Sequence, residues 1–165
     1  MMILPTVLLR HRAYGRNPAV PAGTHYDWLM ADPTDPGGRL WAGRVAMPSR
    51  DWGGLRSWDA TPLPPHRRVY LTFEGLLGPG RGSVRRVDRG WFVPLQWTAD
   101  QRVLDLCFSC CRGRVLLCRA GPDLWRARLL VPKKTDFATG SMSGVGYDQI
   151  VGLWSSLAHI RSRFR

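Results

Sequence analysis

Short runs of apolar residues recur along residues 1–131, and apolar and polar positions alternate within many of them. Clusters rich in Gly, Pro and Asp, such as DPTDPGG, GPGRG and RAGPD, separate these runs. That punctuation is typical of short strands joined by turns. Strands at this spacing predict an all-β fold, a compact closed or partly open β-barrel. The expected strands cover residues 2–11, 24–31, 39–47, 67–75, 82–97, 102–111, 113–120 and 124–131.

Helical periodicity is found only near the C-terminal end of the sequence. Apolar residues recur at helical spacing over 147–165, and arginines gather at the end of this segment, so it predicts one short amphipathic helix. The polar, glycine-rich stretch KKTDFATGSMSGVG before it predicts a linker. The expected organisation is a barrel domain over 1–131, followed by a linker and C-terminal amphipathic helix over 132–165. We expect the helix to pack on the barrel, with docking to a partner or to DNA as the alternative.

The charge balance narrows the class of partner. The formal net charge is +12, and arginine supplies nearly all of the positive charge, because Lys133 and Lys134 are the only lysines. Arginine binds phosphate bidentately and stacks on bases, so this composition favours nucleic acid as partner. The alternative explanation is a GC-rich coding sequence, which also enriches Arg, Gly, Pro and Ala.

The N-terminal segment MMILPTVLLRHR does not resemble an export signal. No basic residue precedes its apolar run, which Pro5 interrupts and Arg10 closes. The sequence also lacks a run of roughly 18 apolar residues that could span a membrane. We therefore expect a cytoplasmic protein without a membrane partner.

The cysteines lie close together, between residues 107 and 118. Cys107 and Cys110 have the C-x-x-C spacing that can begin a zinc site. A second pair at that spacing is missing, since Cys111 and Cys118 are separated by six residues of strand-like sequence. Because they lie among alternating apolar residues, we expect all of them to be structural and unpaired in a reducing compartment.

The stretch HYDW, residues 25–28, carries the first candidate chemistry. Residues two apart in a strand point to the same face, so His25 and Asp27 project together. If His11, at the end of the first strand, lies beside them, the set becomes two histidines and one carboxylate. That ligand set suits a divalent transition metal such as Mn, Fe or Zn. The alternative is a polar strand face without a ligand.

A second stretch, PPHRRVYLTFEG, begins at Pro64. If it forms a strand, the side chains of His66, Arg68, Tyr70 and Thr72 share one face, so that a histidine, a phenol and a guanidinium converge on one substrate group. The alternative is an ordinary polar face of a strand.

A glycine-rich, basic stretch follows, GLLGPGRGSVRRVDRGWF. Its glycines leave backbone amides exposed and its arginines add positive charge, which favours a path for a phosphate backbone. It lacks the lysine and the helix start of a P-loop, so nucleoside triphosphate binding is not expected. The alternative is a simple hairpin with a solvated basic strand.

In chain order, these stretches resemble the 3′-phosphoesterase domain of bacterial DNA ligase D and its small stand-alone relatives. The resemblance covers about residues 5–130. Its motifs are a histidine that closes the first strand, an H-Y-D-F or H-W-D-F type motif, H-x-x-x-Y-x-x-F-E-G, a glycine-rich turn and a strand ending in W-D-R-G. In this sequence they are His11, HYDW at 25–28, HRRVYLTFEG at 66–75, GPGRGSV at 78–84 and VDRGWF at 87–92.

The resemblance implies a metal-dependent, preferably manganese-dependent, enzyme of DNA end repair. Such an enzyme removes 3′-phosphates and terminal ribonucleotides from DNA ends before ligation, alongside a ligase or polymerase that is encoded separately. Another divalent transition metal remains an alternative to manganese. The implied metal ligands are His11, His25 and Asp27, and the implied catalytic residues, in contact with the scissile phosphate, are His66 and Tyr70. The arginines expected to hold the nucleic acid are Arg67, Arg68, Arg81, Arg85 and Arg86.

Two departures from the family pattern leave a second function open. The family has an arginine two residues after the motif aspartate, where this chain has Leu29. Residues 12–24 also form a longer spacer between the two histidines than the family has. The second function is a non-catalytic module of the same fold that binds nucleic-acid ends or a repair partner. Arg56, Arg67 or Arg68 are candidates to replace the missing charge.

Overall fold

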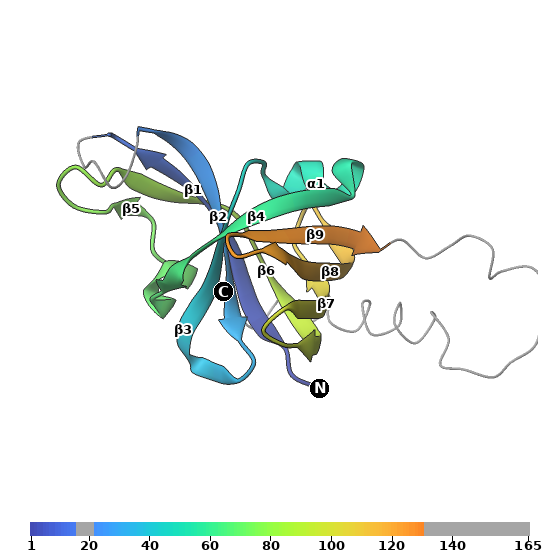
Figure 1. Cartoon of the computed structure of the whole chain (residues 1–165). Helices are drawn as coiled ribbons and strands as arrows, with labels where there is room; N and C mark the ends of the chain where they lie inside the picture. Colours follow the sequence, from blue (N-terminus) through green and yellow to red (C-terminus); the bar gives the residue numbers. More distant parts are fainter. Residues whose placement is uncertain (16–21, 131–165) are drawn as a thin grey trace, which may run out of the picture. The chain divides into compact units, whose positions relative to one another are not determined.

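The structure, a computed structural model, describes residues 1–15 and 22–130. Within these ranges the chain forms one antiparallel sheet of nine strands with little helix (Figure 1). This confirms the all-β fold. The strands are β1 (Leu4–Ala13), β2 (Gly23–Asp32), β3 (Asp35–Val45), β4 (Ser57–His66), β5 (Gly75–Leu76), β6 (Ser83–Trp97), β7 (Gln101–Cys107), β8 (Arg112–Gly121) and β9 (Leu124–Leu130), with the helix α1 (Ser49–Leu55) and the 3-10 helix η1 (Arg68–Leu71).

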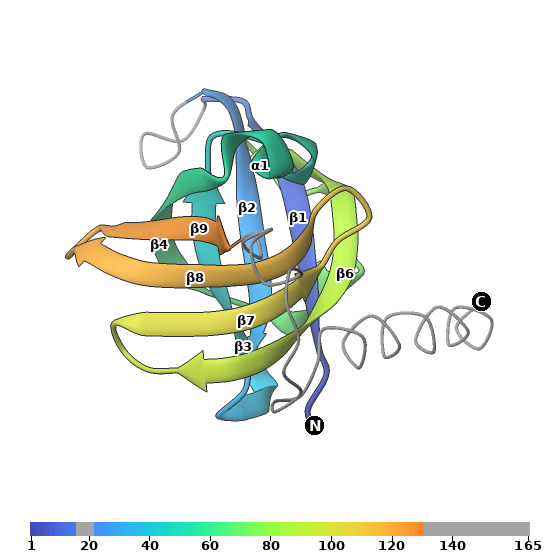
Figure 2. The ribbon, with the colours of Figure 1, turned by 90° about the vertical axis from the view of Figure 1, so that its right-hand side faces the viewer.

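The sheet closes on itself to form a barrel. Its strand order is β1-β2-β3-β4-β9-β8-β7-β6-β5, and β1 also pairs with β6, so that only β5 stays outside the ring (Figure 2). The long strand β6 pairs with β1 over residues 83–92 and with β7 over residues 91–97. Closure places strands from both ends of the barrel sequence in one hydrogen-bonded ring, which removes the exposed edges of an open sheet.

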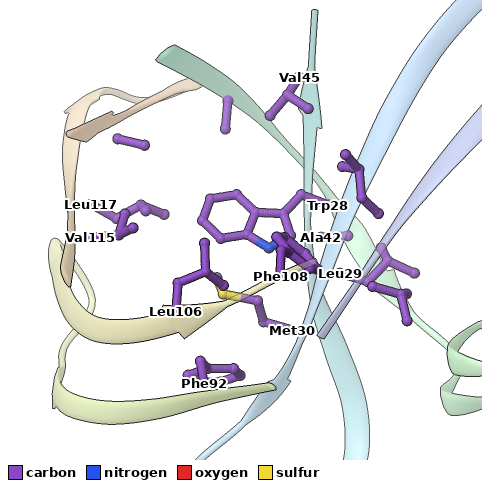
Figure 3. Packing of buried hydrophobic residues seen from close by; sticks show 14 of the residues in the cluster. Trp28, Leu29, Met30, Ala42, Val45, Phe92, Leu106, Phe108, Val115 and Leu117 are labelled. Carbon is purple, nitrogen blue, oxygen red and sulfur yellow. The ribbon is translucent and has the colours of Figure 1, made fainter. Parts of the chain in front are cut away.

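Alternating residues of β2 face opposite sides of the sheet. The indole of Trp28 points into the barrel, whereas the side chain of Leu29 points away from it (Figure 3). Both residues are fully buried, so both faces of β2 are covered at this point. Two consecutive hydrogen bonds fix the indole of Trp28. Its Nε1 donates to Thr6 Oγ1 at 3.0 Å, and this hydroxyl donates to the backbone carbonyl of Leu29 at 2.8 Å.

Helix α1 covers one end of the barrel. Its Trp52 is fully buried, and its ring stacks on that of Trp58 at a centroid distance of 4.3 Å and an interplanar angle of 15°. Trp52 also contacts Trp28 and Phe108. The sequence did not predict α1, because a helix of two turns is too short to show periodicity. It ends at Arg56, which has a left-handed conformation with φ of 60°.

The guanidinium of Arg102 packs against three indole rings in the barrel interior. The Arg102 guanidinium lies 4.2 to 4.8 Å from the ring centroids of Trp97, Trp125 and Trp41. Arg102 is only 8% exposed, and burial lowers its pKa to about 10. Contacts of a cation with aromatic faces offset part of the cost of removing this charge from water.

Two sequence predictions about secondary structure are wrong. Residues 67–75 do not form a strand, since β4 ends at His66 and η1 follows it. Conversely, β4 itself was not predicted, because its prolines argue against a paired strand. The pairing of β4 with β9 ends at Ala60. The prolines of β4 lie after Ala60, where the strand has no β9 partner and its amides on that side need not donate hydrogen bonds.

The predicted C-terminal segment is not tested by the structure. The linker and amphipathic helix expected over 132–165 lie outside the described residues. Among the residues that are described, no helix is long and apolar enough to cross a membrane.

Candidate metal centre

Pairing between β1 and β2 brings the predicted ligands together. His11 lies directly opposite His25 in this antiparallel pair, and Leu9 lies opposite Asp27. The two imidazole rings meet edge to face, with centroids 4.7 Å apart. The long spacer that separates the histidines in sequence therefore does not keep them apart in the fold.

The carboxylate of Asp27 lies between the two imidazoles. Its Oδ2 is 3.7 Å from His11 Nδ1, and its Oδ1 is 3.4 Å from His25 Nε2. One ligand atom from each of the three residues lies within 4.8 Å of the others. Within residues 1–15 and 22–130, this is the group of histidine, cysteine and carboxylate side chains that could hold a metal ion.

Two atoms of this group are buried without a hydrogen bond. His25 Nε2 and Asp27 Oδ1 are both inaccessible and have no hydrogen-bond partner among the described residues. Buried polar atoms in proteins are nearly always hydrogen-bonded, and a cation bound by these two atoms, which lie 3.4 Å apart, would satisfy both. Two donor atoms at about 2.1 Å from one tetrahedral ion lie about 3.4 Å apart. The donor set and its spacing therefore fit a small divalent cation.

Burial disfavours the ionised forms of both residues, whereas neighbouring positive charges add to this effect at His25 and oppose it at Asp27. Burial lowers the pKa of His25 to about 4, and the charges of Arg44 and His11 act in the same direction. Burial also raises the pKa of Asp27, although the charges of His11, His66 and Arg44 oppose this effect. At neutral pH His25 therefore keeps a lone pair free for coordination, and the positive charges near Asp27 offset part of the cost of burying its carboxylate.

The centre lies on the outer side of the barrel wall rather than in its interior. Residues alternate along β2, so His25 and Asp27 share the face of Leu29 and point away from Trp28, which is inside the barrel (Figure 3). Partly buried residues from the segment after β4, namely Tyr70, Leu71 and Phe73, pack against the buried apolar cluster that includes Leu29. The side chains of both histidines keep about one seventh of their surface exposed, so the centre is accessible from outside.

His66 and Tyr70 reach the same region by a different route from the one that the sequence predicted. His66 ends β4, and its charge acts on Asp27. Tyr70 lies in η1, with its ring centroid 5.5 Å from that of His66. The Nδ1 of His66 donates to the carbonyl of Pro64 at 2.8 Å, since a carbonyl can only accept. In its neutral form His66 therefore presents an unprotonated Nε2.

Arg44 was missed by sequence reasoning. It lies directly opposite Asp27 in the β2–β3 pair, and directly opposed residues project from the same face of a sheet. Arg44 is exposed, and its charge acts on both His25 and Asp27. In the sequence, Arg44 lies in the GRV run of β3. Placing it opposite Asp27 requires the register of the β2–β3 pair, which shifts near the turn.

The predicted nucleic-acid arginines are held in different ways. Arg86 is partly buried: its Nη1 donates to the carbonyl of Leu71, and its backbone amide donates to Glu74. A guanidinium nitrogen of Arg68 donates to the carbonyl of Pro36. Both of these arginines therefore stabilise the fold. The guanidinium of Arg67 lies over the ring of Tyr70, and Arg81 and Arg85 are exposed.

The cysteines do not form a second centre. No disulfide joins any of the four, all of which lie in the described part of the chain. Cys111 is buried, and burial raises the pKa of its thiol to about 11, so it behaves as an apolar core residue.

Comparison of the chain with family models gives no match, and comparison with curated proteins gives none either.

Proposed function

We propose that this chain is a metal-dependent phosphoesterase of the DNA ligase D type, which removes 3′-phosphates or terminal ribonucleotides from DNA ends during end repair. One observation carries the proposal: His25 Nε2 and Asp27 Oδ1 face each other, buried and without hydrogen bonds, beside His11. Manganese is the proposed ion, and His11, His25 and Asp27 would hold it.

A divalent ion at this site would neutralise charge on a phosphate oxygen and make a bound water more acidic. The side chains around the ion would bind the phosphate and transfer the proton. Arg44, on the same face as Asp27, is placed to pair with a phosphate oxygen. His66 Nε2 is free to accept or return a proton, because Nδ1 is fixed on the Pro64 carbonyl. The phenol of Tyr70, beside His66, would orient the phosphate.

The charge distribution supports a polyanionic substrate. The net charge is +12, and the exposed arginines Arg81 and Arg85 lie on the turn and strand that follow β5. Binding of nucleic acid through such residues weakens steeply as the salt concentration rises. We propose that the protein acts in the cytoplasm, with a ligase or polymerase as its functional partner.

The experiment uses a DNA primer with a 3′-phosphate, incubated with Mn²⁺ or with EDTA. We expect phosphate release with Mn²⁺, none with EDTA, and loss of activity by at least about 100-fold in Asp27→Asn. Asp59→Asn is the matched control, because Asp59 is an exposed carboxylate that pairs with Arg126. Equal activity of the two variants would refute the proposal.

A second candidate function is a non-catalytic module that binds nucleic-acid ends or a repair partner. The observation that favours it is Leu29, which is fully buried at the position of the family arginine and cannot contact a phosphate. Salt-sensitive binding of the same primer without any phosphate release, with or without Mn²⁺, would support this function over hydrolysis.

A further inference from the structure

The glycine-rich turn between β5 and β6 is built by its own backbone. The amide of Leu77 donates to the carbonyl of Gly82 at 2.9 Å, and the amide of Arg81 donates to the carbonyl of Gly78 at 3.3 Å. Gly78, Gly80 and Gly82 have φ of 103°, 72° and 90°, a region that residues with a side chain rarely adopt. The glycines therefore allow the backbone conformation of this turn.

The turn makes one polar contact with the candidate metal centre. Nε2 of His11 lies 3.0 Å from the backbone carbonyl of Arg81. A carbonyl oxygen can only accept a hydrogen bond, so Nε2 must carry the proton. In the neutral ring the lone pair is then on Nδ1, the nitrogen that lies 3.7 Å from Asp27 Oδ2.

Gly82 allows the turn to approach β1 this closely. A Cβ added at Gly82 would lie 1.9 Å from the carbonyl oxygen of Arg12 and 2.9 Å from the Cα of Ala13. Arg12 is the neighbour of His11 in β1. A side chain at residue 82 would therefore push the turn away from the strand that carries this ligand.

We infer that the glycine-rich turn is a positioning element of the metal centre: the Arg81 carbonyl fixes the tautomer of His11, and Gly82 keeps that carbonyl in place. This role differs from the path for a phosphate backbone that the sequence predicted. The inference rests on the proposed metal site. Histidine ligands of metals commonly donate their other ring nitrogen to a carbonyl or carboxylate, which sets ring orientation, and loss of such a contact weakens metal binding about 10- to 100-fold.

The first test measures the tautomer of His11 directly in the metal-free protein. The ¹⁵N NMR shifts of the imidazole nitrogens, at a pH where the ring is neutral, are expected to show the proton on Nε2. Gly82→Ala is expected to give a mixture of tautomers. Arg81→Ala is the matched control, because it keeps the backbone carbonyl and should leave the tautomer unchanged. A wild-type ring with its proton on Nδ1 would overturn the inference.

The second test measures Mn²⁺ affinity by titration calorimetry. Gly82→Ala is expected to weaken binding about 10- to 100-fold. Gly78→Ala strains the same turn, but a Cβ there meets no described atom within 4 Å. It should change affinity less than about threefold. Equal affinities of Gly82→Ala and the wild type would refute the inference, as would equal losses in the two glycine variants.

The two tests separate this inference from the proposed function. If no variant and no wild-type protein binds Mn²⁺, the proposed metal site fails and the inference fails with it. If Mn²⁺ binds but no phosphate is released, hydrolysis fails while the effects of Gly82→Ala on tautomer and affinity still support the positioning role. If unfolding measurements show that Gly82→Ala does not fold, the wild-type tautomer and the Arg81→Ala control decide the result.

Discussion

Leu29 and Arg44 show how the identity of single residues shapes the site. The family resemblance expects an arginine at residue 29, but this leucine is fully buried. Positive charge instead comes from Arg44 on the next strand, directly opposite Asp27. Spacing within one strand predicts which side chains share its face, but a contribution from a neighbouring strand depends on the register between them.

Restoring the family arginine is therefore predicted to fail. Leu29→Arg would place a charge in a fully buried position, which we expect to lower the free energy of unfolding by on the order of 4 kcal/mol. Leu29→Met, which nearly conserves volume, should cost less than about 1.5 kcal/mol. Urea denaturation of both variants measures the difference. A Leu29→Arg protein with wild-type stability would show that this position is open to solvent.

His25 gives the metal-free protein a pH dependence. Its pKa is about 4 in the folded chain and 6.5 when unperturbed, so the unfolded chain takes up the proton first as the pH falls. This contribution to stability is fully present above pH 6.5 and is lost as the pH falls towards 4. His25→Gln, which does not titrate, is expected to lose less stability over the same range. Urea denaturation in EDTA across that range tests this, and parallel pH profiles would contradict it.

At the scale of elements, the VDRG stretch of β6 proves to be structural. Asp88 is buried, and its carboxylate accepts hydrogen bonds from the hydroxyl of Ser49 in α1 at 2.6 Å and from the amide of Ser109 at 3.1 Å. It therefore links α1, β6 and the β7–β8 turn. Gly90 lets β6 approach β7, since a Cβ there would lie 1.9 Å from the carbonyl oxygen of Cys107.

Asp88→Ala tests this link. Removing the carboxylate leaves the buried hydroxyl of Ser49 and the partly buried donors of Ser109 without their acceptor, so we expect a loss of about 3 kcal/mol in the free energy of unfolding. Asp100→Ala is the control, because Asp100 is an exposed turn residue whose ion pair with Arg119 is worth at most about 1 kcal/mol. Thermal or urea unfolding that ranks the two variants equally would contradict the structural role.

The sequence predicted most strands because their apolar residues alternate or cluster between turns. It failed at β4, whose prolines lie in the part of the strand that pairs with β3 but not with β9. It failed again at η1, where β-branched and aromatic residues of an apparent strand instead pack as a short helical turn. In both places contacts with distant segments override the local preference, and these contacts are absent from a linear pattern.

At the scale of the whole barrel, its closure creates both the core and the candidate site. The pairing of β1 with β2 on one side and β6 on the other brings His11 beside His25 and beside the turn that carries Arg81. The sequence predicted His25 and Asp27 as a pair from strand periodicity alone. It gave no measure of the distance to His11 or His66, because these distances depend on the registers of the β1–β2, β2–β3 and β3–β4 pairs.

The cluster around Arg102 is predicted to stabilise the barrel. Arg102→Ala removes the contacts with Trp41, Trp97 and Trp125 and leaves a cavity, so we expect a loss of about 3 kcal/mol. Arg126→Ala, which breaks an exposed ion pair with Asp59, should cost at most about 1 kcal/mol. Urea denaturation compares them, and a stable Arg102→Ala protein would show that the three indoles pack without the guanidinium.

The most direct test of the account is a calorimetric titration of Mn²⁺ into the wild-type protein, Asp27→Asn and Asp59→Asn. We predict binding at one site in the wild type and in Asp59→Asn, and affinity lower by at least about 100-fold in Asp27→Asn, because the buried oxygens between His11 and His25 lose their charge. Absence of binding to the wild type, or equal affinity in Asp27→Asn, would contradict the metal centre.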